Sequence, residues 1–321
     1  MRPERKNMKL NPLTKSQIKI GTRTSKLALF QAELVKSRLV QLYPDLYVQI
    51  VKIKTTGDII HHTPVEVLGP GIFTREIEKA LLDREIDLAV HSAKDMATKL
   101  PEGLALGAVL TREDPCDCLV ARDGRKLREL PMGANIGTSS LRRKAQLRRL
   151  RADIQISDIR GNVDTRIRKI QDGEYDGTVI ALAGLKRLML NHFVTEVFHQ
   201  DDFLPQAGQG TLAIEIRKDD VEINELIKPL NDPETMTALL AERSFLRELE
   251  GGCQIPAGIS SRQENGTLSL TGGIFSPTEN KEVRKSLSGS TKDPETLGKN
   301  LAQLILKFGG AEILSEIRNE K

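Results

Sequence analysis

Residues 136–143 read IGTSSLRR, and they open a basic stretch that runs to Lys169. A short apolar start followed by small hydroxyl residues is typical of a strand that turns into the N-terminus of a helix. Such an end presents unpaired backbone N–H groups and the positive end of the helix dipole to an anion. Arg142 and Arg143 fall in the first turn, where the dipole disfavours cations, so an external anion is the simpler explanation for them.

A second turn of the same kind lies near the start of the chain. Residues 18–21, IKIG, predict a strand that runs into residues 22–25, TRTS, and a helix then extends to about Leu42. Arg23 and Ser25 therefore belong to this turn. A solvated basic helix face is the alternative for either cluster taken alone, but two clusters on such turns favour anion binding.

Strands and helices alternate along most of the chain, up to an apolar strand at residues 212–216. This order indicates an α/β fold with mixed or parallel sheets and helices on both faces. A charged break, a helix that begins at Asp232, and three β segments follow, which predicts a small α+β third domain. The expected division is an N-terminal tail 1–17, a first lobe of 18–110 with 204–217, a second lobe 116–203, and a third domain 222–321.

The composition limits the possible partners. Aromatic residues are 3% of the 321 residues and Trp is absent, which is poor material for stacking nucleic-acid bases. Three cysteines, an odd number, argue against a disulfide framework and for a reducing compartment. No apolar run approaches the ~18 residues of a membrane span, and the first residues lack the apolar core of a secretory signal. We therefore expect a soluble cytoplasmic protein that binds neither nucleic acid nor membrane.

A buried strand is predicted at residues 87–90, DLAV, and residues 91–95, HSAKD, follow it. Ligands bind at the carboxyl ends of strands in open α/β sheets, which makes Asp95 a candidate functional carboxylate with Ser92 close by. A plain surface pair between Asp95 and Lys94 is an equally good reading of these residues alone.

Two further segments contain residue types that often carry chemistry. Cys253 follows two glycines after a helix, and a small buried hydrophobe is the usual role of such a cysteine. His61 and His62 have no cysteine or acidic residue at metal-ligand spacing, so no metal site is expected.

Several of these segments together resemble the porphobilinogen deaminase (hydroxymethylbilane synthase) family. The resemblance runs from about Ile18 into the C-terminal region and is densest up to Pro256. Each segment alone is weakly specific, but their order and spacing are specific together. The segments that carry it are residues 21–25, 56–58, 91–95, 137–143, 160–162, 183–187, 208–210 and 249–254.

The resemblance implies a three-domain α/β enzyme with two lobes similar to periplasmic binding proteins. It implies a monomeric transferase that joins four porphobilinogen molecules head to tail, releases ammonia at each addition and frees the linear tetrapyrrole by hydrolysis. It also implies a covalent dipyrromethane primer on Cys253 through a thioether, no metal, and Asp95 as the catalytic residue. The cofactor-binding residues that it implies are Arg23, Ser25, Ser92, Lys94, Thr138, Ser140, Arg142, Arg143, Arg160, Gly161, Arg166, Arg187, Gln209 and Cys253.

The chemistry of these residues suits such a substrate. Porphobilinogen carries an acetate and a propionate, so a growing oligopyrrole is a polyanion that arginine forks would hold through paired bonds. A carboxylate beside the pyrrole N–H groups would help ammonia to leave and stabilise the resulting cation. Lys94 would keep the neighbouring Asp95 ionised, because a nearby opposite charge favours the charged form.

One segment departs from the family pattern. Glu66 and Pro70 stand where the family's lid usually carries lysines that contact cofactor carboxylates. The alternative function is a non-enzymatic, two-lobed polyanion-binding protein, which would need the arginines but neither Asp95 nor Cys253. A nucleic-acid binder is supported only by the basic stretch.

Overall fold

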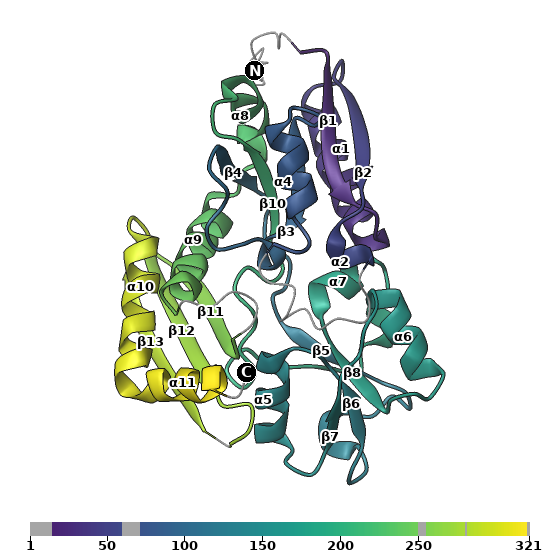
Figure 1. Ribbon diagram of the computed structural model, residues 1–321, viewed down its shortest axis with the longest axis vertical. Coiled ribbons are helices and arrows are strands. Elements are labelled where there is room, and N and C mark those ends of the chain that lie inside the picture. The colour runs from purple at the N-terminus through teal and green to yellow at the C-terminus, as the bar shows by residue number, and fades with distance from the viewer. Residues whose placement is uncertain (1–14, 60–70, 250–254, 280, 320–321) are drawn as a thin grey trace, which may run out of the picture.

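The computed structural model describes residues 15–59, 71–249, 255–279 and 281–319. Figure 1 shows two lobes, one above the other, with a third domain at their left. The expected α/β class, with two lobes and a smaller α+β domain, is confirmed. No helix in these ranges is long and apolar enough to span a membrane.

The first lobe is built on a five-stranded mixed sheet with the order β2-β1-β3-β10-β4. Strands β1, β2 and β3 are parallel, whereas β10 runs antiparallel to both of its neighbours. Its elements are β1 (Gln17–Arg23), α1 (Lys26–Leu42), β2 (Tyr47–Ile53), α2 (Thr56–Ile59), α4 (Arg75–Leu82), β3 (Leu88–Ser92), the 3₁₀ turn η1 (Ala93–Asp95), β4 (Leu104–Val109) and β10 (Leu212–Arg217).

The second lobe repeats this plan with the order β7-β6-β8-β5-β9. Here β6 is parallel to β7 and β8, and β5 is antiparallel to β8 and β9. Its elements are β5 (Asp117–Ala121), η2 (Leu127–Glu129), β6 (Asn135–Gly137), α5 (Leu141–Leu150), β7 (Gln155–Ser157), α6 (Val163–Gln171), β8 (Gly177–Ala181), α7 (Leu182–Arg187), η3 (Asn191–Phe193) and β9 (Glu196–Val197).

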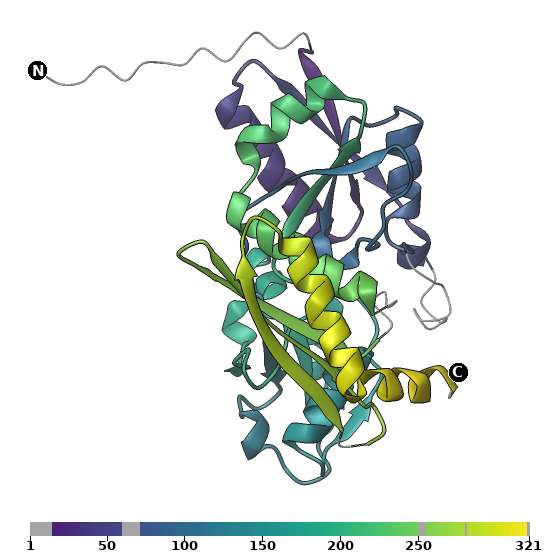
Figure 2. The same cartoon turned by 90° about the vertical axis from the view of Figure 1, so that its left-hand side faces the viewer.

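The third domain consists of an antiparallel sheet, β11-β12-β13, and helices that pack on one face of it. Figure 2 shows this domain from its outer side, with α10 in front of the strands. Its core contains Phe245 from α9 and Leu301 from α10, both fully buried. Its elements are α9 (Pro233–Glu248), β11 (Ala257–Glu264), β12 (Thr267–Phe275), β13 (Glu282–Ser290), α10 (Pro294–Ile305), η5 (Leu306–Gly310) and α11 (Ala311–Asn319).

The segment between β10 and α9 belongs with the first lobe. Helix α8 (Val221–Ile227) and the short turn η4 (Lys228–Leu230) place Ile223, Leu226 and Leu230 in the core that covers the first sheet. We therefore place the start of the third domain near Asp232 instead of at residue 222. The side chain of Asp232 caps α9 by accepting a hydrogen bond from the Thr235 N–H, and Pro233 begins the helix.

Two chain crossings join the lobes, one from β4 to β5 and one from β9 to β10. The two crossings touch at Gly210, where the Glu113 N–H donates a hydrogen bond to the Gly210 carbonyl at 3.2 Å. Gly210 has φ +87°, and a Cβ there would lie 2.1 Å from the Glu113 carbonyl oxygen. Only glycine fits so close an approach.

Candidate active site

The first lobe contributes the turn that follows β3. The Ala93 N–H donates to the Thr211 carbonyl at 3.0 Å, and the Gln206 side chain donates to the Lys94 carbonyl at 3.2 Å. Asp95 ends this turn and is half-buried. Of the residues that the structure describes, none donates a hydrogen bond to the Asp95 carboxylate. The turn therefore holds Asp95 through its backbone and leaves its oxygens available to a ligand.

Lys94 lies where charges from both lobes meet. Its ammonium donates to the Gln209 side-chain oxygen at 3.4 Å. Burial lowers the pKa of Lys94 to about 8, opposed by the attraction of Asp95 and assisted by the repulsion of Arg143. The structure thus brings Lys94, Asp95 and Gln209 together with Arg142 and Arg143 of the second lobe.

The second lobe contributes the turn between β6 and α5. The Ser140 side chain caps α5 by accepting a hydrogen bond from the Arg143 N–H, and the Thr138 hydroxyl oxygen accepts one from the Ser140 N–H at 3.3 Å. The predicted strand-to-helix turn is therefore confirmed, and Arg142 and Arg143 lie in its first helical turn.

The explanation of these two arginines by an external anion alone was wrong. The fully buried carboxylate of Asp117 lies between them, 2.7 Å from Arg142 Nη1 and 2.7 Å from Arg143 Nη2. Burial works to raise the pKa of Asp117, but the charges of Arg142 and Arg143 outweigh it and lower that pKa to about 2. An internal anion from β5 therefore offsets part of the unfavourable interaction of the arginines with the helix dipole.

Backbone carbonyls also accept hydrogen bonds from Arg142 and Arg143. Arg142 Nη1 donates to the Leu204 carbonyl at 2.6 Å, and Arg143 Nη1 donates to the Val179 carbonyl at 3.0 Å. In the part of the chain that the structure describes, these contacts leave Nε and Nη2 of Arg142 without a partner. This edge of the guanidinium remains able to bind a carboxylate.

Arg166 adds a further cation that interacts with Asp95, and Arg160 lies close to Arg166. Arg166 Nε donates to the Gly161 carbonyl at 2.8 Å, and Gly161 has φ +112°, which favours glycine. Burial, together with the nearby charges of Arg143 and Arg160, lowers the pKa of Arg166 to about 10, against the attraction of Asp95. Arg160 is half-buried, and none of the described residues forms an ion pair or hydrogen bond with its side chain.

Arg23 is held within the first lobe. Its Nη2 lies 2.5 Å from Asp58 Oδ1, and its guanidinium carbon lies 4.1 Å from the centre of the Phe73 ring. Burial alone would raise the pKa of Asp58, but the hydrogen bonds from Arg23 and Thr55 outweigh it and the pKa is lowered. Ser25 caps α1 by accepting a hydrogen bond from the Ala28 N–H.

Two predicted site residues have mainly structural contacts. Arg187 Nη2 donates to the Gly210 carbonyl at 2.6 Å, which ties α7 to the crossing between the lobes. Burial lowers the pKa of Arg187 to about 10. Ser92 shares a hydrogen bond with the Gln31 side chain of α1 at 2.9 Å.

The rest of the basic stretch stabilises domain contacts and helix ends. Arg149 forms an ion pair with Glu282 of the third domain at 3.0 Å, and Arg148 donates to the Pro277 carbonyl. Arg151 pairs with Asp153 at 2.7 Å. These arginines of the stretch therefore form contacts outside the cluster of Arg142, Arg143, Arg160 and Arg166.

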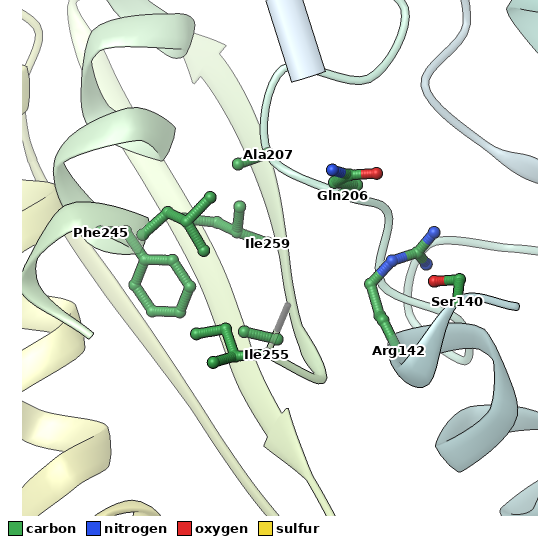
Figure 3. A pocket seen from close by; sticks show the side chains of 9 residues that line it. Ser140, Arg142, Gln206, Ala207, Phe245, Ile255 and Ile259 are labelled. Atoms are coloured by element: carbon green, nitrogen blue, oxygen red, sulfur yellow. The ribbon is translucent and has the colours of Figure 1, made fainter. Parts of the chain in front are cut away.

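A small pocket lies between the N-terminus of α5 and the third domain. Figure 3 shows the guanidinium of Arg142 beside Ser140 and near Gln206, with Phe245 and Ile255 on the opposite side. Ile255 stands two residues after Cys253 in the sequence. Cys253 itself, like Glu66, Pro70, His61 and His62, lies outside the described residues.

Sequence reasoning missed the carboxylates that hold the arginines. Asp117 is the one charged residue of β5, an otherwise apolar strand, and that was the available signal. Asp58 was part of a quoted motif without an assigned role. Glu242 also went unnoticed: it is fully buried and binds Arg112 of the inter-lobe crossing at 2.6 Å.

Cysteine chemistry elsewhere in the chain is limited. Cys116 and Cys118 are unpaired thiols. Burial raises the pKa of each thiol to about 12, so neither is a reactive thiolate near neutral pH.

Comparison with known proteins gives consistent matches over nearly the whole chain. Residues 18–225 match the family model described as "Porphobilinogen deaminase, dipyromethane cofactor binding domain", and residues 236–307 match "Porphobilinogen deaminase, C-terminal domain". The porphobilinogen deaminase of Syntrophobacter fumaroxidans is 47% identical over 95% of this chain and 99% of its own length. That of Pelotomaculum thermopropionicum is 46% identical over 96% of this chain and 99% of its own length.

Similar solved structures are more distant. The methionine binding protein MetQ has a TM-score of 0.43 and 14% identity, covering 70% of this chain and 93% of that chain. The periplasmic aliphatic sulphonate binding protein SsuA from Escherichia coli has a TM-score of 0.40 and 16% identity, covering 74% of this chain and 71% of that chain.

Proposed function

The chain belongs to the porphobilinogen deaminase family, and from this premise we propose how its side chains carry out the reaction. The protein is a transferase of tetrapyrrole and haem biosynthesis that joins porphobilinogen molecules head to tail on a dipyrromethane cofactor and releases ammonia. The non-enzymatic binding protein is set aside, because the family is one of enzymes. The finer proposals concern the residues, the attachment of the cofactor, the compartment and the oligomeric state.

The charges of the site fit a cofactor and substrate that carry many carboxylates. Lys94 interacts with the charges of Asp95, Asp117, Arg142 and Arg143, and Arg166 interacts with those of Asp95, Arg143 and Arg160. Cations outnumber carboxylates in this group of residues. Such an excess of half-buried and buried cations is costly until an anion joins it. When bound, the dipyrromethane supplies acidic side chains and the pyrrole carbon to which the first substrate is joined.

Binding is the task of the arginines and of the turn at Ser140. The free edge of the Arg142 guanidinium, the side chain of Arg160, and the hydroxyls of Thr138 and Ser140 are the donors for ligand carboxylates. Arg143 is bound on three nitrogens to Asp117 and Val179, so its role is to raise the local positive potential. Arg23, Arg187 and Gln209 shape the cleft through contacts within the protein and can exchange them for ligand contacts.

Asp95 carries the chemistry. A carboxylate with no donor from the described residues can accept hydrogen bonds from pyrrole N–H groups. It then stabilises the positive charge that develops on the substrate as ammonia leaves, and it can hold the proton that the pyrrole carbon loses after the new bond forms. The observation that carries the proposal is this carboxylate at the end of β3, facing the cations of the second lobe.

Cys253 is the attachment point of the cofactor in this proposal, through a thioether. Its support is the family resemblance and the position of Ile255 at the wall of the pocket that Arg142 and Ser140 line. We further propose a cytoplasmic location, supported by the odd number of cysteines and the unpaired Cys116 and Cys118. We also propose a monomer, which the family resemblance implies.

The deciding experiment is Asp95→Asn, analysed by intact mass and turnover. We expect the purified variant to keep the mass of the covalent cofactor while its rate falls about 10²- to 10⁴-fold, because the amide can neither hold the proton nor stabilise the cation. Asp83→Asn, at an exposed ion pair in the same lobe, is the matched control and should turn over normally. Retention of more than about a tenth of the rate by Asp95→Asn would contradict the role of Asp95.

A further inference from the structure

The orientation of the Asp95 carboxylate depends on the backbone that carries it, since no described side chain donates a hydrogen bond to it. On the side before Asp95, the crossing from β9 to β10 holds the turn through Thr211 and Gln206. On the side after Asp95, residues 96–100 lead towards β4 of the same lobe, and a different element holds them.

That element is α9. Leu239 packs with Ala93 and Met96 in one apolar cluster. One helical turn later, Arg243 Nη2 donates to two successive backbone carbonyls, Ala97 at 2.7 Å and Thr98 at 3.2 Å. A charged donor makes shorter and stronger hydrogen bonds than a neutral one. Two bonds from one nitrogen to neighbouring carbonyls also restrict the backbone torsions between them.

The residue next to Arg243 holds the other side of the same turn. Glu242 accepts a hydrogen bond from the Gly208 N–H at 2.7 Å and pairs with Arg112 at 2.6 Å. Glu242 and Arg243, which are adjacent in α9, therefore fix both the crossing from β9 to β10 and the segment after Asp95. This helix precedes Cys253 directly in the sequence, with Arg243 ten residues before it.

We propose that Arg243 is a positioning residue for the reaction, which sets the orientation of Asp95 by holding the Ala97 and Thr98 carbonyls against α9. The inference rests on the proposed role of Asp95. Arg243 does not reach the reacting atoms in this arrangement; it acts through the backbone. Because a misplacement of about 1 Å can cost about 10²-fold in rate, loss of this contact should affect turnover more than binding.

Arg247 supplies a matched control. It lies one turn further along α9, is exposed, and forms an ion pair with Glu295 inside the third domain at 3.1 Å. It therefore shares the residue type and the helix with Arg243, but among the described residues its hydrogen bonds and ion pair go to Ser244 and Glu295 and not to the segment after Asp95. Arg243→Met and Arg247→Met keep the aliphatic stem and remove the donors in both cases.

The experiment measures kcat per cofactor-loaded enzyme, KM, cofactor occupancy by intact mass, and hydrogen exchange of the peptide spanning residues 92–100. For Arg243→Met we expect kcat to fall about 10- to 100-fold, with KM within about threefold and occupancy as in the parent protein. Exchange in the 92–100 peptide should become faster. Arg243→Lys keeps a charged donor, so its kcat should be at least about threefold higher than that of Arg243→Met. The kcat of Arg247→Met should stay within about twofold of the parent value.

Two results would overturn the inference. One is a kcat for Arg243→Met within about twofold of the parent. The other is a loss of cofactor occupancy and unfolding midpoint with normal kcat in the loaded fraction, which would show a purely structural role. If Arg243→Met does not fold, Arg243→Gln is measured instead, and parent-like kcat and exchange in it count against the inference. Asp95→Asn is measured in parallel. An active Asp95→Asn variant would contradict the proposed function. An inactive Asp95→Asn variant together with a parent-like kcat for Arg243→Met would contradict only this inference.

Discussion

The two lobes share one strand plan but carry different charged residues after their central strands. In the first lobe, the central parallel strand β3 leads into the turn with Lys94 and Asp95. In the second lobe, its counterpart β8 leads into α7, which ends at Arg187. The common topology thus fixes where these turns lie, and the side chains make one lobe the source of the proposed catalytic carboxylate and the other the source of most of the proposed binding cations.

The arginines at the two strand-to-helix turns also differ: Arg23 is the last residue of β1, whereas Arg142 and Arg143 lie in the first turn of α5. Arg23 in the first lobe is partly exposed and pairs with Asp58, which follows the neighbouring strand. Arg142 and Arg143 in the second lobe are buried around Asp117, which comes from the antiparallel strand β5. Burial around a carboxylate makes the second pair part of the structure as well as of the site, so loss of that carboxylate should have the larger effect on folding.

Asp117→Asn is the sharpest way to break this comparison. Removing one member of a buried charge cluster leaves the other charges uncompensated, which costs about 3 to 5 kcal/mol. We expect the free energy of unfolding, measured by urea denaturation, to fall by that amount. Asp123→Asn, at an exposed ion pair in the same lobe, should change it by less than about 1 kcal/mol. Equal effects of the two substitutions would show that Asp117 is not the anchor of the arginines.

The pH dependence of stability tests the same structural role of Asp117. The pKa of Asp117 is lowered from 3.8 to about 2 in the folded protein. A lowered folded pKa adds stability that is fully present above the unfolded value and is lost as the pH falls through the folded one. The difference in urea midpoint between the parent protein and Asp117→Asn should therefore be constant above about pH 5 and shrink between about pH 4 and 2. A difference that already shrinks between about pH 7 and 5 would assign the effect to another group.

The smallest expected effect concerns an exposed ion pair between the two lobes. Lys26 of α1 and Asp164 of α6 form an ion pair at 2.9 Å, with the Lys26 side chain 76% exposed. Exposed pairs contribute about 0 to 1 kcal/mol and weaken with salt. A double-mutant cycle of Lys26→Met with Asp164→Asn should give a coupling energy in that range. A coupling above about 2 kcal/mol would mean that this pair locks the lobes together and is not a weak surface contact.

Local patterns predicted the elements that build the site. The spacing of apolar residues and the capping residues Ser25, Ser140 and Asp232 located α1, α5 and α9 close to their observed starts. These signals succeed because a cap and its N–H partner lie within three residues of each other. The family segments then brought Asp95, Lys94 and the arginines into one hypothesis, and the structure places these together.

Contacts distant in sequence were not predictable in this way. Asp117 stands 26 residues before Arg143, and Glu242 stands 130 residues after Arg112, yet each pair is in direct contact. No periodicity links such positions, because the sheet order and the chain crossings bring them together. The same reason explains why the Arg142–Arg143 pair was assigned to an external anion.

The sequence by itself determined the class of fold, the two strand-to-helix turns, the family and the identity of the chemical groups, because these follow from local periodicity, capping and motif order. Only the tertiary structure decided which arginines face the site, which carboxylates neutralise them, and which helix holds the turn of Asp95. Those outcomes depend on burial and on distances between strands far apart in the chain, and electrostatic interactions in a folded protein are set by both.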